Sequence, residues 1–394
     1  MQSNDIIDVL ENYEATTFID ERFTDDIATL SLRFSGKTSF NITVCLQLLE
    51  LYRKATHKLP FFVEHKLALD KRSYEQSTSQ RVALYKSQLI NGGTLLDITA
   101  GLGVDATFLS SGFDYVKAVE KNENLHKMAS YNMAKAKVTK VQRILGDGKS
   151  ELKGKYDWIY IDPDRRNDTK RLVTLENLEP NVLDLLPQLE EIARMVYIKI
   201  SPLFDVQEVW RLFENCDTIH LIAEKGEVKE VGVVLNHTKS TLKKEIVLKD
   251  VVTGFEVKLD KDVNLFKLPK TDVSYSNILV PDPLVAKANV GSFLLKDKNS
   301  AKHNSFEIYY SNDSFIEGFR SFEILYKSGL SSKEIKANLS RLGITKINIV
   351  IKGLNDKPSV WHKKLGTSDG GEFYLFVLKS ASTSEALILR KIIS

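Results

Sequence analysis

The spacing of hydrophobic residues divides the chain into parts of different character. In residues 1–75 they recur every three or four positions, as at Ile6 and Leu10 and again from Ile42 to Tyr52. This spacing is typical of amphipathic helices. We therefore expect a helical N-terminal region that acts as a cap or lead-in, and its sequence shows no chemistry of its own.

Short apolar runs alternate with helical stretches through residues 76–236. A helix through Tyr85 and Leu89 should end at Asn91-Gly92-Gly93, because a glycine pair stops a helix. Further helical stretches lie near residues 104–111, 122–137, 180–194 and 206–215, and the predicted strands are Thr94–Ile98, Tyr115–Glu120, Lys140–Leu145, Trp158–Ile161, Val196–Ile200, Thr218–Ala223 and Val228–Leu235. This alternation predicts a parallel sheet with helices on both faces.

The last two predicted strands are joined only by Glu224–Glu227. Parallel strands need a crossover of about a dozen residues or more, so this short connection predicts an antiparallel final strand. We interpret the charged run Glu227, Lys229 and Glu230 at its start as a solvated strand edge. The pattern therefore predicts an α/β fold whose seven-stranded sheet ends in an antiparallel strand.

After residue 236 the pattern changes again. Residues 237–275 alternate Lys and Asp with Val, Leu and Phe, which predicts short solvent-facing strands. An α+β unit then opens at Ile278–Pro283, with strands near Phe306–Tyr310 and Lys346–Ile351, a helix near 332–341, and a final hairpin of Glu372–Leu378 and Ala386–Ile393. We expect four segments: a helical region at 1–75, the α/β domain at 76–236, a small β-rich segment at 237–315 and a C-terminal domain at 316–394.

Composition narrows the class of protein. The 394 residues are too many for one compact core, and 43% hydrophobic with 27% charged residues is typical of a globular protein. No apolar run reaches the ~20 residues that a membrane span needs, and the N-terminus lacks the features of a secretory signal. Two cysteines, Cys45 and Cys216, argue against a disulfide scaffold or a multi-cysteine metal site. We therefore expect a cytoplasmic protein without a membrane or metal partner.

The charge is nearly balanced over the whole chain, at +3. Residues 311–394 are more basic, with 13 Lys and Arg against 8 Asp and Glu, a net charge of +5. A basic terminal domain suits nucleic acid, and a solvated lysine-rich surface accounts for it equally well.

A glycine loop follows the first predicted strand. It reads Asp97-Ile98-Thr99-Ala100-Gly101-Leu102-Gly103-Val104-Asp105 and leads into a helix. Glycine lets the backbone approach a ligand closely, and the amides at the start of the helix face that ligand with a partial positive charge. The loop is typical of a nucleotide-binding βαβ unit. It does not by itself reject NAD, because Ala106 is tolerated at the third glycine position.

Polar motifs also end the next three predicted strands. Glu120 ends the second strand, about 20 residues beyond the loop, where an acid can accept both hydroxyls of a ribose. Gly146-Asp147-Gly148 ends the third strand, and Asp162-Pro163-Asp164-Arg165-Arg166 ends the fourth. An acid after the third strand suits the adenine of S-adenosylmethionine, and the methyl acceptor is met after the fourth. A Gly-Lys-Ser/Thr phosphate loop is lacking, so ATP hydrolysis is not expected.

Together these motifs resemble the class I S-adenosylmethionine-dependent methyltransferases, which have a Rossmann-like sheet. More narrowly, the chain resembles a bacterial family of methyltransferases with a THUMP-like C-terminal domain. The resemblance implies that residues 237–315 are ferredoxin-like and that residues 316–394 are THUMP-like. The matching stretches are Glu75–Ser79, Thr99–Asp105, Asp157–Pro163, Arg165-Arg166, Lys199–Pro202, Pro281–Pro283 and Asp369–Phe376.

The resemblance implies a role for each motif. Asp97, Gly101 and Gly103 would lie at the methionine end of S-adenosylmethionine, Glu120 at the ribose and Asp147 at the adenine. Further candidates for cofactor binding are Ser77, Thr78, Thr99, Asp105, Lys121 and Gly148. The catalytic, acceptor-facing candidates are Asp162, Pro163, Arg165 and Arg166. The aspartate could orient or deprotonate an acceptor N–H or O–H, and the arginines could hold a phosphate or stack on a base.

The acceptor is less well defined. A THUMP-like domain points by analogy towards RNA as the partner. Methylation at cytosine C5 needs a thiolate, and neither Cys45 nor Cys216 lies beside a strand-end motif. Lys199 and Ser201, at the end of the fifth predicted strand, suit a site role and a turn equally. Three alternatives stay open: a non-catalytic RNA-binding protein on this scaffold, a methyltransferase for a small molecule or protein, and a nicotinamide-dependent dehydrogenase.

Overall fold

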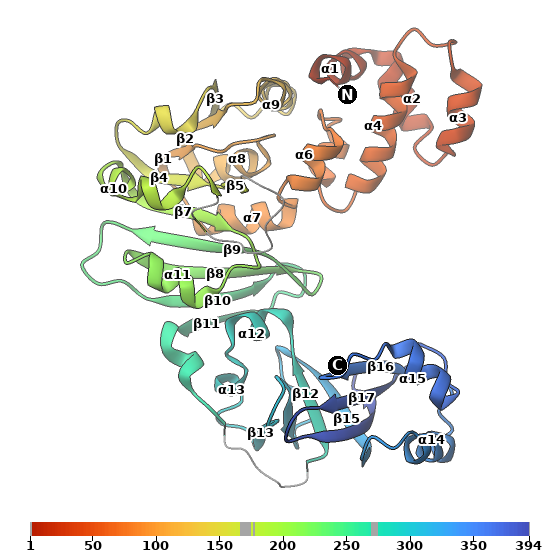
Figure 1. The fold of residues 1–394 in the computed structure, drawn as a ribbon. Helices are drawn as coiled ribbons and strands as arrows, with labels where there is room; N and C mark the ends of the chain where they lie inside the picture. Colours follow the sequence, from red (N-terminus) through yellow and green to blue (C-terminus); the bar gives the residue numbers. More distant parts are fainter. Residues whose placement is uncertain (1, 166–174, 176–177, 269–274, 394) are drawn as a thin grey trace. The chain divides into compact units, whose positions relative to one another are not determined.

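The computed structural model describes residues 2–165, 175, 178–268 and 275–393. The chain forms two compact units, and Figure 1 shows the elements of each. Unit 1 comprises Met1–Glu224 and Lys229–Lys244, and unit 2 comprises Lys225–Val228 and Glu245–Ser394. The four segments expected from the sequence stay a prediction. In the described parts of the chain, no helix has the length and apolar character that crossing a membrane requires.

Unit 1 opens with helices, as the hydrophobic spacing predicts. Side chains at their N-termini accept backbone N–H bonds and so satisfy donors that a helix start leaves free. Asn12, Asn41 and Asp70 do this at α2, α4 and α6, whose bounds follow. The helices are α1 (Ser3–Glu11), α2 (Tyr13–Glu21), α3 (Ile27–Phe34), α4 (Ile42–Ala55), α5 (Pro60–Glu64), α6 (Lys71–Gln76) and α7 (Gln80–Leu89). The prediction of a helical N-terminal region is confirmed.

The N-terminal helices share a hydrophobic core with the central part of unit 1. Buried Leu49 and Tyr52 of α4 belong to the same cluster as Leu102 of the glycine loop. A buried amide adds polar contacts, because Asn132 accepts from the backbone N–H of Ala68 at 2.6 Å and donates to its carbonyl at 2.9 Å. The helical region is therefore packed against the glycine loop and against α8 (Val104–Leu109) and α9 (Glu123–Lys135).

The strands of unit 1 form the predicted sheet. They are β1 (Gly92–Asp97), β2 (Phe113–Glu120), β3 (Val141–Leu145), β4 (Tyr156–Ile161), β7 (Ala193–Ile200), β8 (Cys216–Glu224) and β9 (Glu227–Asn236), in the spatial order β8-β9-β7-β4-β1-β2-β3. Neighbours from β7 to β3 run parallel, and β9 runs antiparallel to β7. The predicted antiparallel ending is confirmed. The buried runs of β1, β4 and β7 form the centre of this sheet and the core beneath the site.

The remaining elements of unit 1 connect these strands. They are α8 (Val104–Leu109), α9 (Glu123–Lys135), α10 (Val182–Ile192) and α11 (Val206–Leu212), the 3₁₀ turns η1 (Ser110–Gly112) and η2 (Gly148–Glu151), and an antiparallel pair of β5 (Asp164–Arg165) with β6 (Leu178–Glu179). All four helices coincide with predicted helical stretches.

The glycine pair Gly92-Gly93 differs from its prediction as a helix stop. Helix α7 already ends at Leu89, and the two glycines open strand β1. A Cβ atom on Gly92 would lie 3.0 Å from the Cβ of Asp157, and the Asp157 carboxylate accepts the N–H of Gly93 at 2.9 Å. The glycines are therefore needed for the close approach of β1 to β4.

Unit 2 contains a second sheet with helices. Its elements are β10 (Glu245–Asp250), β11 (Glu256–Asp260), η4 (Lys261–Leu265), β12 (Asn277–Pro281), α12 (Pro283–Ala288), α13 (Gly291–Leu294), β13 (Ser300–Lys302), β14 (Tyr309–Ser311), β15 (Phe319–Ser328), α14 (Ser332–Arg341), β16 (Asn348–Lys352), α15 (Pro358–Leu365), β17 (Phe373–Lys379) and β18 (Ser384–Lys391). Seven strands lie in the order β13-β14-β12-β15-β18-β17-β16. The predicted helix at 332–341 and the final hairpin of β17 and β18 are confirmed.

Two expectations for unit 2 are wrong in detail. Strand β10 does not face solvent, because Ile246, Val247 and Leu248 are buried in succession. The strand predicted at Phe306–Tyr310 begins only at Tyr309. The His303 ring accepts the backbone N–H of Phe306 at 3.2 Å, which holds that residue in a turn ahead of the strand.

Candidate functional site

A cavity of about 390 Å³ lies at the carboxyl ends of β1, β2 and β4 in unit 1. Helix α6 contributes to its wall through Arg72, Ser73 and Gln76, so the N-terminal region supplies part of the site. All predicted cofactor-binding residues and the first acceptor-side residue line this cavity: Ser77, Thr78, Asp97, Thr99, Gly101, Gly103, Asp105, Glu120, Lys121, Asp147, Gly148 and Asp162. Motifs far apart in the sequence are thus brought to one place.

The glycine loop has a conformation that side chains would oppose. Gly101 and Gly103 adopt φ of +51° and +83°, in the left-handed region. A Cβ atom on Gly103 would lie 2.8 Å from the Cε atom of Met133, whereas one on Gly101 would meet no atom within 4 Å. The backbone is therefore closely packed at Gly103 and faces open space at Gly101.

Glu120 is fixed against this loop. One carboxylate oxygen accepts the N–H of Gly101 at 2.8 Å, and the other accepts the N–H of Asn122 at 2.7 Å. An ionised carboxylate has about four acceptor positions, so the group can still accept bonds from a ligand. The end of β2 and the loop after β1 thus act as one rigid wall.

Gly148 lies against the first strand. A Cβ atom there would lie 2.1 Å from the carbonyl oxygen of Ile98, so no side chain fits. The preceding Asp147 accepts the N–H of Lys149 at 3.1 Å, which starts the turn η2. Turn formation is predictable from Gly-Asp-Gly, but the contact with Ile98 is not, because it joins the ends of two strands that are distant in sequence.

Asp97 is buried at the end of β1. It accepts the backbone N–H of Thr99 at 3.0 Å, and the Thr99 hydroxyl accepts the N–H of Asp162 at 2.7 Å. Burial, together with the nearby Asp105 and Asp162 carboxylates, raises the pKa of Asp97 to about 7, against the opposing effects of the Thr99 N–H and Arg143. The protonation of this carboxyl group therefore changes near neutral pH.

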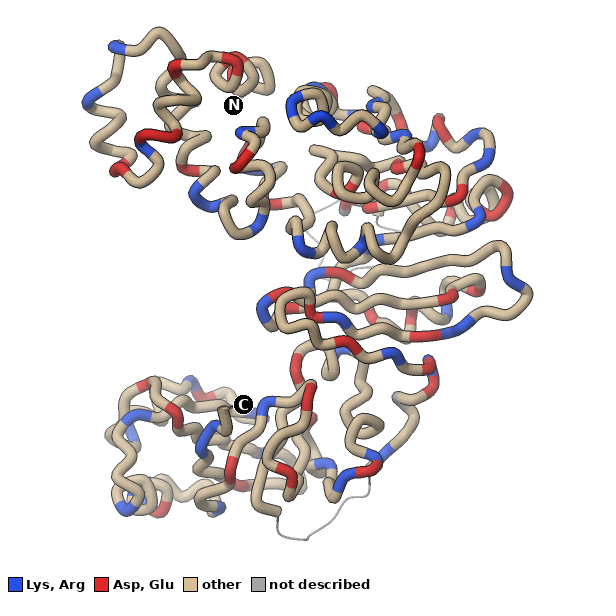
Figure 2. The backbone as a smooth tube through the Cα atoms, turned by 180° about the vertical axis from the view of Figure 1, so that it is seen from behind, with Lys and Arg blue, Asp and Glu red and all other residues tan. Residues whose placement is uncertain are grey.

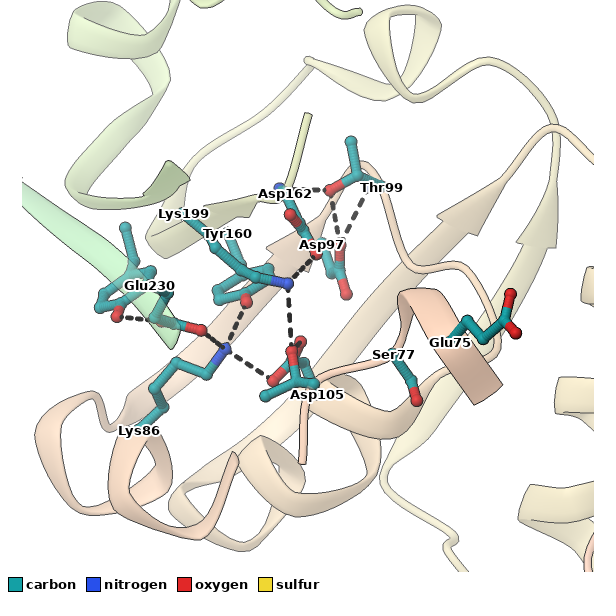
Figure 3. A network of polar contacts seen from close by, with 12 residues as sticks. Glu75, Ser77, Lys86, Asp97, Thr99, Asp105, Tyr160, Asp162, Lys199 and Glu230 are labelled. Carbon is teal, nitrogen blue, oxygen red and sulfur yellow. Dashed lines mark hydrogen bonds and ion pairs between the residues drawn. The ribbon is translucent and has the colours of Figure 1, made fainter. Parts of the chain in front are cut away.

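A chain of polar contacts starts at Asp162, as Figure 3 shows. The Nζ atom of Lys199 lies 2.6 Å from Asp162 Oδ2 and 3.2 Å from the Thr78 hydroxyl. Thr78 in turn donates to Asp105 at 2.7 Å. The end of β7, the segment before α7 and the start of α8 are thus joined beside the cavity. Lys199 thus contacts the cavity-lining Asp162, and its site role stays a prediction.

The chain of polar contacts continues into the protein interior. Lys86 of α7 is fully buried and lies 2.8 Å from Asp105 and 3.1 Å from Glu230. Its ammonium also donates to the Tyr160 hydroxyl at 2.8 Å, and Tyr197 donates to Glu230 at 2.8 Å. Buried charges are tolerated when they are paired in this way. The interpretation of Glu230 as a solvated residue is wrong, because its side chain is only 1% exposed and forms this pair.

Comparisons with known proteins identify the fold. A family model described as "THUMP domain-like" matches residues 319–391. A crystal structure of a "putative methyltransferase" from Porphyromonas gingivalis W83 superposes with a TM-score of 0.82 at 21% identity, over 96% of this chain and 98% of that one. Over nearly its whole length the chain has the fold of that protein, and residues 319–391 are THUMP-like. The resemblance read from the motifs is confirmed at this level.

Other similarities are partial. The METTL16 methyltransferase domain has a TM-score of 0.36 at 16% identity, over 48% of this chain and 97% of that one. The tRNA m1G37 methyltransferase of M. jannaschii has a TM-score of 0.30 at 14% identity, over 42% and 52%. Likeness at this level supports no inference. A search of curated proteins finds no match to the sequence.

The other three predicted acceptor-facing residues are Pro163, Arg165 and Arg166. Pro163 follows Asp162 but does not line the cavity. Arg165 ends the short strand β5, and Arg166 lies outside the described residues. The two cysteines are buried, and burial raises the pKa of each thiol, Cys45 and Cys216, to about 12.

Sequence reasoning missed the interior half of the polar chain. Lys86, Tyr160, Tyr197 and Glu230 were not candidates. One signal was available in the sequence. Lys86 lies on the same helix face as Val82 and Ala83, and the residues of a buried helix face are usually apolar. A lysine at such a position indicates a buried acidic partner, although the sequence does not identify which one.

Proposed function

We propose that this chain is an S-adenosylmethionine-dependent methyltransferase and that the described cavity holds the cofactor. One observation carries the proposal. Three carboxylates, Asp97, Glu120 and Asp147, stand at the carboxyl ends of β1, β2 and β3 and line the same cavity as the glycine loop. In an open α/β sheet the ligand lies at this edge.

The residues fit the chemistry of the proposed cofactor. The open space above Gly101 leaves room for a ligand against the backbone. Glu120 offers acceptors for ribose hydroxyls, and Asp97 offers a carboxylate to an ammonium group. When bound, S-adenosylmethionine supplies a methyl group on a cationic sulfonium. Acidic residues at the cavity complement that charge.

On the acceptor side, Asp162 is the residue placed to act. Its side chain is 34% exposed, in contrast to the buried Asp97, and it faces the cavity beside Lys199. A carboxylate there can accept a hydrogen bond from an N–H or O–H group and hold the acceptor in line. The contribution of the protein would be mainly alignment and exclusion of water.

We propose RNA as the acceptor. The proposal is supported by the THUMP-like match at residues 319–391 and by the net charge of +5 over residues 311–394. Lys and Arg lie interspersed with Asp and Glu along this segment, so the positive charge is spread and not gathered at one point (Figure 2). Binding that rests on phosphate contacts should weaken steeply as salt concentration rises.

Nucleoside mass spectrometry tests the acceptor. RNA from a strain lacking the gene should lose one methylated nucleoside, and the wild-type gene should restore it. An unchanged profile, together with intact cofactor binding, would move the acceptor to a protein or a small molecule. Failure to bind S-adenosylmethionine at millimolar concentration would instead overturn the enzyme proposal and favour a non-catalytic RNA-binding protein.

A further inference from the structure

The contact between Lys199 and Asp162 follows from the sheet itself. Ile161 and Ile198 are register partners in the parallel pair β4 and β7. The next residues along the two strands bring the Lys199 ammonium to 2.6 Å from the Asp162 carboxylate (Figure 3). Both side chains are partly shielded from solvent, at 17% and 34% exposed. This ion pair is therefore set by the backbone of two strands, unlike an ion pair between flexible surface side chains.

Lys199 has a second polar partner besides Asp162. Its ammonium donates to Thr78, which donates to Asp105, and Asp105 is paired with fully buried Lys86. Buried Glu230 completes the set. Two ammonium groups thus face three carboxylates, Asp105, Asp162 and Glu230, which leaves one negative charge in excess.

The charges around Lys199 decide the protonation of its ammonium group. Burial alone would lower the pKa of Lys199, but the Asp162, Asp105 and Glu230 carboxylates outweigh it and raise that pKa above its ordinary value, against the repulsion of Lys58 in the turn after α4. Lys199 is therefore a constant cation and not a base. Asp162 faces further acids, Asp97 from β1 and Asp164 from β5, as well as the hydroxyl of Tyr160 on its own strand. Among the described residues, Lys199 is the cation that forms an ion pair with Asp162.

We propose that Lys199 is a positioning residue, which pairs with the Asp162 carboxylate and fixes its direction, and that this pair suits a nitrogen acceptor. The proposal rests on the proposed methyltransferase function. A carboxylate bound to an ammonium is a weak base, too weak to take the proton of an alcohol before methyl transfer. A nitrogen acceptor can attack through its lone pair while its N–H points at Asp162.

The step balances without another reactant. The lone pair of the acceptor nitrogen forms the new N–C bond as the S–C bond of the sulfonium breaks, and the electron pair of that bond stays on sulfur as a neutral thioether. The acceptor nitrogen becomes positively charged at this stage. Its N–H proton then passes to the Asp162 carboxylate and on to solvent, which restores the starting state of the protein.

The test uses full-length protein, radiolabelled S-adenosylmethionine and bulk RNA from a strain that lacks the gene. The variants are Lys199→Met, Lys199→Arg and the control Lys117→Met. Lys117 lies on strand β2, pairs with Glu151 and is outside the cavity lining. Methyl incorporation is measured between pH 5 and 9, and S-adenosylhomocysteine affinity and thermal unfolding are measured beside it. Affinity and unfolding separate a local effect from a failure to fold.

We expect the acid limb of kcat/KM to move up by about 1–3 pH units in Lys199→Met, because Asp162 loses its cation among other acids. Lys199→Arg should keep the wild-type limb, since the charge remains. Lys117→Met should leave the profile unchanged. Cofactor affinity should stay within about threefold in all three, because Lys199 acts on the acceptor side.

Two results would overturn the inference while leaving the methyltransferase proposal in place. One is a Lys199→Met protein that is folded, binds S-adenosylhomocysteine and keeps the wild-type pH profile; if that variant does not fold, a Lys199→Arg profile shifted upward is the equivalent result. The other is a product with the methyl group on ribose oxygen or carbon. Wild-type protein that binds no cofactor would instead contradict the proposed function itself.

Discussion

The backbone N–H of Gly101 donates to the carboxylate of Glu120 at 2.8 Å. This bond joins the turn after β1 to the end of β2, so the loop conformation and the position of the acid depend on each other. The glycine loop and Glu120 thus form one wall of the cavity. Substitutions at either residue should affect ligand binding through the other.

Glu120→Gln tests this wall. The amide replaces one acceptor oxygen by a donor that faces the N–H of Gly101 or Asn122. Loss of a charged acceptor costs about 1.5–3 kcal/mol, so S-adenosylhomocysteine affinity should fall roughly 10- to 100-fold by calorimetry. Exposed Glu123 provides the control, and Glu123→Gln should bind as wild type does. Equal affinities for wild type and Glu120→Gln would remove Glu120 from the site.

Gly148→Ala and Gly146→Ala form a matched pair two residues apart. A methyl group on Gly148 would lie 2.1 Å from the Ile98 carbonyl oxygen, whereas one on Gly146 meets no atom within 4 Å. Gly148→Ala should lower the free energy of unfolding by about 1–3 kcal/mol, as overpacking does, and should weaken cofactor binding. Gly146→Ala should change neither quantity. Urea unfolding measures the free energy of unfolding of both variants, and equal values would contradict the observed contact.

Lys86→Met tests the interior pairs. The substitution leaves Asp105 and Glu230 without their buried cation, which costs about 3–5 kcal/mol of stability. Lys54→Met, which removes the exposed partner of Glu50, should have a much smaller effect. Urea unfolding of both variants measures the difference. If Lys86→Met is also rescued in part by Glu230→Gln, the pair is the cause; equal stabilities of Lys86→Met and wild type would refute it.

Two aspartates should affect stability with opposite dependence on pH. The pKa of Asp97 is raised to about 7, so the folded state binds the extra proton between about pH 4 and 7 and loses that contribution as pH rises. The pKa of Asp157 is lowered, mainly by backbone hydrogen bonds from Thr94 and Gly93, so its contribution is present at neutral pH and lost in acid.

The free energy of unfolding of Asp97→Asn should therefore gain on wild type as pH rises from 5 to 8. That of Asp157→Asn should be below wild type at pH 7, and the deficit should shrink towards pH 3. Urea unfolding across this range measures both. Parallel curves for Asp97→Asn and wild type would show that the Asp97 carboxyl group is not perturbed by folding.

Much of unit 1 is predictable from local pattern. Strands such as Trp158–Ile161 are buried on both faces and appear as continuous apolar runs, and the short link Glu224–Glu227 allows only an antiparallel return. The strand-end acids are predictable for the same reason, because the topology of the sheet fixes which ends meet.

The interior polar chain was not predictable in this way. Lys86 and Glu230 are 144 positions apart, and nothing local distinguishes Glu230 from its exposed neighbour Glu227. The contribution of the N-terminal helices to the cavity wall was also not predicted. It depends on a long-range contact, the paired hydrogen bonds of Asn132 with Ala68, and on a shared core that no periodicity reveals.

Calorimetric titration of the purified protein with S-adenosylmethionine at pH 7.5 is the decisive test of cofactor binding in this cavity. We predict saturable binding at one site per chain, weakened by Asp97→Asn and Glu120→Gln and unaffected by Glu123→Gln. Absence of binding at millimolar S-adenosylmethionine, or binding that neither Asp97→Asn nor Glu120→Gln changes, would contradict it.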